Sequence, residues 1–73
     1  MIAEDSPGLY WDATYAIVMA LLEHYPEIEP GEIGLHELQH LVIGLPDFKD
    51  DPGLANERIL MDIQITWFEE AKE

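Results

Sequence analysis

The sequence predicts a small all-α domain, built mainly from three helices. Three segments carry apolar residues at the three- and four-residue spacing of a helix, and segments rich in Pro, Gly and Asp separate them. No segment alternates strongly between apolar and polar residues, and no internal repeat is present. Because a chain of 73 residues buries only about 60% of its unfolded surface, it has room for one core. We therefore expect a flexible N-terminal tail at residues 1–8 and a single helical domain at residues 9–73.

The first helix is expected at residues 13–24, with Asp12 as its N-cap. The apolar residues at helical spacing in and just after this segment are Ile17, Val18, Leu21, Leu22 and Tyr25. Pro26 and Pro30 follow, and the chain is expected to turn there because the residue before a proline avoids the α-helical conformation. A short strand within residues 28–35 is an alternative for the segment that comes next.

The second helix is expected at residues 35–44, where one apolar stripe runs along the segment. Its members are Leu35, Leu38, Leu41, Val42 and Leu45. Gly44 and Pro46 are expected to end the helix. Residues 47–53 then form a connector rich in Asp, Pro and Gly, which favour turns, and we expect Phe48 to anchor this connector to the core.

The third helix is expected at residues 54–71 and has the clearest pattern. Its apolar face consists of Ile59, Leu60, Ile63 and Trp67. Its acids, which are available elsewhere on the helix, are Glu57, Asp62, Glu69 and Glu70. Since Trp67 is in register with Leu60 and Ile63, we expect its indole to lie in the core.

The composition is strongly acidic, and this restricts the classes of partner. The chain has sixteen Asp and Glu residues and only three Lys and Arg residues, which gives a formal net charge of −13 at pH 7. Such a charge repels nucleic acid and anionic lipid, whereas it attracts cations and basic protein surfaces. High charge can indicate disorder, but 48% hydrophobic residues supply enough apolar surface for a folded core.

The cellular compartment is expected to be the cytoplasm. The chain has no Cys, so neither a disulfide framework nor a thiolate metal site is available. Glu4 and Asp5 stand where a secretory signal would have basic residues, and no run approaches the ~18 apolar residues of a membrane span. We therefore expect neither export nor membrane insertion.

Two acidic segments are candidate sites. Clustered carboxylates can bind a hard cation such as ferrous iron weakly while the ion keeps part of its water shell. The first set, at the entry to the third helix, is Asp47, Asp50, Asp51 and Glu57. Simple stabilisation of the helix N-terminus by ~0.3–1 kcal/mol is the alternative reading of these acids. The second set is Glu27, Glu29 and Glu32, for which an ordinary solvated loop is the alternative.

The second helix also contains a short zinc signature. His36-Glu37-Leu38-Gln39-His40 spells His-Glu-x-x-His, which on a helix places two imidazoles at i and i+4 with a Glu as general base. A minimal zinc-dependent hydrolase is therefore the alternative function. It requires a third ligand and a cleft, and without them the segment is an ordinary polar helix face.

The C-terminal half contains the most specific motif of the sequence. Residues 46–60 read Pro-Asp-Phe-Lys-Asp-Asp-Pro-Gly-Leu-Ala-Asn-Glu-Arg-Ile-Leu, and they are followed by Ile63, Trp67 and Glu69-Glu70-Ala71. This segment resembles the pattern of the IscX family of bacterial iron–sulfur cluster assembly, which is Asp-Phe-x-Asp-Asp-Pro, then Asn-Glu-Lys/Arg-Ile-Leu, then a Trp near an acidic C-terminus. Earlier in the chain, Trp11, Tyr25-Pro26 and Pro30 match the first third of the pattern.

The resemblance implies a fold similar to a winged helix-turn-helix that lacks a proper wing. It also implies a non-enzymatic adaptor or modulator that binds the cysteine desulfurase and weakly binds ferrous iron through exposed carboxylates. The family places acids on the first helix where this sequence has Ala13, Ala16 and Met19, which leaves Asp12 and Glu23 there. The expected site therefore moves to the acids that come later in the chain.

These observations combine into one functional hypothesis. We expect a monomeric adaptor with no tightly bound cofactor, whose partners are the cysteine desulfurase and other iron–sulfur assembly proteins. The expected metal-binding residues are Asp47, Asp50, Asp51 and Glu57, and the expected partner-binding residues are the same four with Glu27 and Glu29. A DNA-binding winged helix follows from fold analogy alone, and the acidic charge opposes it.

Overall fold

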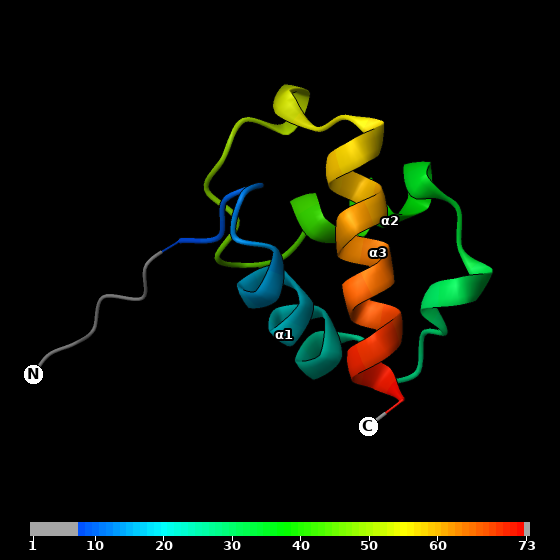
Figure 1. The fold of residues 1–73 in the computed structure, drawn as a ribbon. Helices are drawn as coiled ribbons and strands as arrows, with labels where there is room; N and C mark the ends of the chain where they lie inside the picture. The colour runs from blue at the N-terminus through cyan, green and yellow to red at the C-terminus, as the bar shows by residue number, and fades with distance from the viewer. Residues whose placement is uncertain (1–7, 73) are drawn as a thin grey trace, which may run out of the picture.

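The computed structural model describes residues 8–72 and contains three α-helices and two 3₁₀ turns (Figure 1). The elements in chain order are α1 (Thr14–His24), η1 (Pro30–Glu32), α2 (Leu35–Ile43), η2 (Pro52–Leu54) and α3 (Glu57–Ala71). The described residues contain no strand, so the predicted all-α class is confirmed. Apart from Gly8, the expected N-terminal tail lies outside the described residues. None of the described helices is long and apolar enough to cross a membrane.

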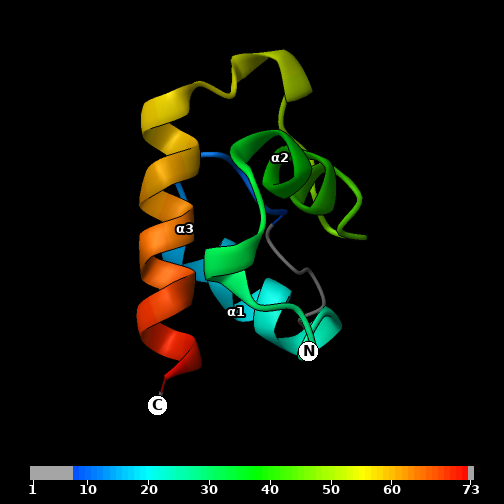
Figure 2. The ribbon, with the colours of Figure 1, turned by 90° about the vertical axis from the view of Figure 1, so that its right-hand side faces the viewer.

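The three helices form two layers around one core. In Figure 1 α3 lies in front of α1 and α2, and Figure 2 shows α3 on one side with the other two helices on the opposite side. The fully or almost fully buried apolar residues are Leu9, Trp11, Ile17, Val18, Leu21, Leu38, Val42, Leu45, Leu60, Ile63 and Trp67. Each large side chain buried in this way contributes about 1.5–3 kcal/mol of hydrophobic stabilisation.

The core confirms most of the apolar positions expected from periodicity. Leu60, Ile63 and Trp67 are the buried face of α3, and the Trp67 side chain is 0% exposed, as predicted. Phe48 packs half-buried against the core and so anchors the connector between α2 and α3, which was also expected. Leu9 adds a core residue from the segment that precedes α1.

The start of α1 differs from the sequence prediction. Asp12 was expected to be the N-cap, but this was wrong: the N-cap is Ala13, and no side chain caps the helix. The backbone N–H of Ala13 donates to the Tyr10 carbonyl at 2.9 Å, which closes a turn just before the helix. Trp11 is buried in the core, whereas the neighbouring Asp12 is exposed to solvent and makes no cap hydrogen bond with α1.

The other boundaries shift by small amounts for identifiable reasons. The helix α2 ends at Ile43 with Gly44 as its C-cap, one residue earlier than expected. The helix α3 begins at Glu57 instead of residue 54, because Pro52–Leu54 forms its own 3₁₀ turn and Asn56 caps the helix. The alternative of a short strand within residues 28–35 was wrong, since Pro30 starts the 3₁₀ turn η1 there.

Candidate functional site

The connector between α2 and α3 is held against the segment that precedes α1. The Leu9 N–H donates to the Asp47 carbonyl at 2.8 Å, and the Lys49 N–H donates to the Leu9 carbonyl at 3.0 Å. These two bonds form an isolated parallel bridge between Leu9 and Phe48. The rings of Trp11 and Phe48 pack edge to face with centroids 5.0 Å apart. The acidic connector therefore has a defined conformation.

Asp50 is a structural carboxylate. Its Oδ2 accepts a hydrogen bond from the Trp11 backbone N–H at 2.9 Å, and its Oδ1 accepts from the Asp51 N–H at 2.7 Å. Both oxygens therefore pair with backbone donors that would otherwise lack a partner in this irregular segment. Asp50 links the start of the domain to the connector.

Asp51 has a similar local role. Its carbonyl accepts from the Trp11 indole Nε1–H at 2.8 Å, while its Oδ1 accepts from the Gly53 N–H at 2.9 Å and so caps η2. The side chain remains exposed, so its other oxygen faces solvent. Asp51 thus caps η2 and not α3, the helix whose N-terminus these acids were considered to stabilise.

Asp47 and Glu57 are the less constrained members of the predicted set. Both are exposed, and Asp47 uses only its backbone carbonyl in the bridge to Leu9. Glu57 is the first residue of α3, where the helix dipole favours its charge. The cap of α3 is Asn56, whose Oδ1 accepts from the Ile59 N–H at 2.9 Å. Asn56 was not among the residues predicted from the sequence, although an Asn just ahead of a periodic apolar run is a recognised start signal for a helix.

The predicted metal ligands do not converge on one point. Within residues 8–72, no group of three or more His, Asp or Glu side chains lies close enough together to hold a metal ion. A pre-built centre made from Asp47, Asp50, Asp51 and Glu57 is therefore not present in this structure. Binding of ferrous iron by fewer carboxylates, with water completing its shell, stays a prediction.

The second acidic segment lies far from the first. Glu27 and Glu29 are exposed in the loop between α1 and η1, and Glu32 is exposed within η1. Figures 1 and 2 both place this loop toward the C-terminal end of α3, whereas the acidic connector lies toward its N-terminal end. A single small partner patch cannot include both segments. Partner binding by each of the two acidic segments therefore stays a separate prediction.

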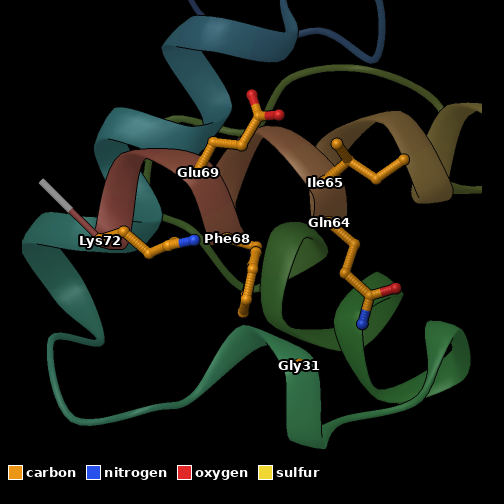
Figure 3. Close-up of a pocket in the computed structure, with 6 residues that line it drawn as sticks. All are labelled: Gly31, Gln64, Ile65, Phe68, Glu69 and Lys72. Atoms are coloured by element: carbon orange, nitrogen blue, oxygen red, sulfur yellow. The ribbon is translucent and has the colours of Figure 1, made fainter.

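The zinc signature forms the expected helical pair, but residues 8–72 supply no third ligand for it. His36 and His40 are both exposed on α2, and their rings stand edge to face with centroids 4.7 Å apart. No third His, Asp or Glu of residues 8–72 joins them in a metal-binding group. A pocket of about 400 Å³ does open in the structure, but it lies between η1 and α3 and no histidine lines it (Figure 3).

The fold and the surface define a small acidic all-α domain in which the described carboxylates either hold loops in place or face solvent. The family model described as iron–sulphur cluster assembly matches residues 9–72. An uncharacterized protein of Pseudomonas aeruginosa is 37% identical over 63 residues, which cover 86% of this chain and 96% of that protein. The chain therefore belongs to the iron–sulfur cluster assembly family, the IscX family.

Proposed function

We propose that this protein is an adaptor or modulator that docks on the cysteine desulfurase of iron–sulfur cluster assembly. The observation that carries the proposal is the family match over residues 9–72. The charge of −13 supports it, because an acidic protein of this size associates readily with a basic surface. The role is that of an accessory protein and not of a catalyst.

The proposed contact is the loop face, which we define as Asp47, Asp50, Asp51 and Glu57. Its members have two different tasks. Asp50 and Asp51 hold the connector in shape through their hydrogen bonds to backbone N–H groups. Asp47 and Glu57 are exposed and present charge to a partner. Lys49 is also exposed in this segment and neutralises part of the local charge.

A charged surface of this kind mainly raises the rate of association and sets the orientation in which the two proteins dock. Complementary charge raises the rate of encounter and suppresses wrong docking poses, and salt screens it over about 8 Å at physiological ionic strength. Because the connector is already held in place by Trp11 and Phe48, its ordering adds little to the entropic cost of binding. We therefore expect binding that is fast and sensitive to salt.

Weak ferrous iron binding is a second part of the proposal. Support comes from exposed carboxylate oxygens, which suit a hard divalent cation. Since no three such groups converge within residues 8–72, the ion would keep most of its water shell. Ferrous iron would then be bound only transiently. We expect the affinity of the protein for ferrous iron to fall when Asp47 is changed to Asn.

Isothermal titration with the cysteine desulfurase tests the docking proposal. The variant Asp47→Lys reverses one exposed charge of the loop face, and Glu37→Lys, on the exposed side of α2, makes the same change in net charge elsewhere. We expect Asp47→Lys to weaken binding about three- to tenfold and Glu37→Lys to weaken it much less, with both affinities falling as salt rises. No binding at low salt, or equal effects of the two variants, would refute the proposal.

A further inference from the structure

One side of α3 carries large apolar side chains that the rest of the described chain covers only in part. Met61, Ile65 and Phe68 are 44%, 53% and 42% exposed. They lie on the side of the helix opposite Leu60, Ile63 and Trp67, which form the buried face of α3. Phe68 lies at the edge of this set, beside Gly31 of η1 (Figure 3). The helix α3 is thus apolar on two faces.

The outer residues follow the spacing of a coiled-coil seam. The steps along the chain alternate between three and four residues, which is the pattern of heptad positions a and d. We name this set the α3 seam; its members are Arg58, Met61, Ile65, Phe68 and Lys72. The apolar residues occupy the centre of the seam and the two basic residues occupy its ends. The Lys72 ammonium lies 5.2 Å from the centre of the Phe68 ring, so its stem shields part of this apolar surface in the free protein.

The flanks of the α3 seam are acidic. Asp62 and Glu69 occupy the positions equivalent to e in the heptad, two turns apart on one side. On the other side, Glu57 occupies a position equivalent to g, whereas the Gln64 side chain at the next g position is already bound to the segment around η1. In a helix pair, these flanking positions contact the partner and determine which partner fits. Three acids on the flanks therefore favour a partner helix with Lys or Arg beside its apolar stripe.

A pocket adjoins the seam at Phe68. Its volume is about 400 Å³, and its lining residues are Gly31, Gln64, Ile65, Phe68, Glu69 and Lys72 (Figure 3). The Gln64 amide donates to the carbonyls of Pro30 at 2.8 Å and Ile33 at 3.0 Å, which fixes η1 beside α3. A Cβ added at Gly31 would lie 3.6 Å from Cε1 of Phe68, so the missing side chain is what leaves this wall open. The pocket has room for one side chain of a partner.

A second copy of this chain is a poor occupant of the seam. An antiparallel pair of α3 helices would bring Asp62 and Glu69 of one copy toward the same acids of the other. Each copy also carries a charge of −13, so association would bring two strongly acidic molecules together. The charge pattern thus points away from a homodimer.

We propose that the α3 seam is a docking surface for an amphipathic helix of another protein, whose apolar stripe is flanked by Lys and Arg. The partner's apolar side chains pack on Met61, Ile65 and Phe68, and its basic residues face Asp62, Glu69 and Glu57. One of its apolar side chains enters the pocket beside Gly31. This surface is separate from the acidic connector, and the inference does not depend on docking to the desulfurase.

The test uses two synthetic helices of equal charge. Both have about three heptads with Lys at positions e and g; one has Leu at a and d, and the other has Ser there. Lys at the flanking positions keeps the Leu helix from pairing with itself. Binding of each labelled helix to the full chain is followed by fluorescence anisotropy at about 0.15 M salt, where long-range attraction is largely screened. We expect the Leu helix to bind at least tenfold more tightly than the Ser helix.

Three variants locate the contact. Ile65→Ser removes the centre of the seam and Gly31→Leu fills the pocket, and each should weaken binding of the Leu helix about tenfold. Tyr15→Ser removes an apolar side chain of α1 that is 59% exposed, and it should leave binding unchanged. Thermal unfolding verifies that each variant is folded. Equal binding of the two helices, equal effects of Ile65→Ser and Tyr15→Ser, or a dimer in sedimentation that Ile65→Ser abolishes would each overturn the proposal.

Discussion

Trp11 and Trp67 both lie in the core, but their indole N–H groups differ in hydrogen bonding. The Nε1–H of Trp11 donates to the Asp51 carbonyl at 2.8 Å. Within residues 8–72, the buried Nε1 of Trp67 has no hydrogen-bond partner. An unsatisfied buried donor costs about 1–3 kcal/mol. This cost offsets part of the stabilisation that Trp67 gains from packing, whereas Trp11 has no such cost.

This contrast predicts which of two matched substitutions lowers the free energy of unfolding more. Trp67→Phe leaves a small cavity but also removes the unsatisfied donor, so we expect it to lower the free energy of unfolding by less than about 1.5 kcal/mol. Trp11→Phe loses a formed hydrogen bond as well as packing, and we expect a loss of about 2 kcal/mol. Urea unfolding followed by circular dichroism measures both. A Trp67→Phe cost clearly above that of Trp11→Phe would contradict this account.

Asp50 allows a second prediction at the residue scale. Asp50→Ala leaves the Trp11 and Asp51 N–H groups without their acceptor, and we expect the free energy of unfolding to fall by about 1–2 kcal/mol. The control is Asp47→Ala, which removes an exposed carboxylate and should change the stability by less than about 0.5 kcal/mol. Equal costs in urea unfolding would show that Asp50 is not a structural residue.

The contacts of Asp50 and Asp51 with Trp11 could not be predicted from the sequence, because the partners are distant in the chain. Trp11 lies 39 and 40 residues away from them, and local patterns carry no information on such contacts. The sequence did predict that acids gather in this connector, since that is a matter of composition. The division into structural carboxylates and exposed ones required the fold.

At the scale of single elements, hydrophobic spacing located all three helices. It works because a helix of a small domain must bury one stripe, and that stripe repeats every three or four residues. The start of α3 was placed three residues early, because Pro52 and Gly53 belong to a separate 3₁₀ turn with its own cap from Asp51. Periodicity identified the buried face of α3, but the sequence analysis did not single out the exposed apolar residues Met61, Ile65 and Phe68 on its other side.

The N-cap of α3 gives a prediction at this scale. Asn56→Ala removes the acceptor for the Ile59 N–H, and we expect it to lower the free energy of unfolding by about 1 kcal/mol. Asn56→Asp keeps an acceptor at the same position and should be nearly neutral. Chemical denaturation of the three proteins decides this, and a cost for Asn56→Asp as large as that for Asn56→Ala would contradict the capping role.

The histidine pair of α2 gives another prediction at the scale of single elements. His36 and His40 have no third ligand among residues 8–72, so we expect protein purified without a histidine tag to contain far less than one zinc per chain. The double variant His36→Ala/His40→Ala should then retain the stability of the parent. Elemental analysis and thermal unfolding measure these outcomes. One zinc per chain that the double variant loses would revive the hydrolase alternative.

For the whole molecule, charge and family membership indicate function more strongly than any single residue. The chain belongs to the iron–sulfur cluster assembly family, and the motif at residues 46–60 indicated this family before the fold was known. Composition predicts that nucleic acid and anionic lipid are unfavourable partners, because net charge acts at long range whatever the fold. The position of the acids around α3 was not predictable. It depends on how the loops return across the helix layers.

The central claim is that the protein docks on the cysteine desulfurase through the loop face. The most direct measurement is a ¹⁵N NMR titration of the labelled protein with the unlabelled desulfurase at low salt. The account predicts that amide signals of residues 47–51 and Glu57 shift or broaden first, while those of His36 and His40 on α2 stay in place. Unchanged spectra, or changes confined to α2, would contradict it.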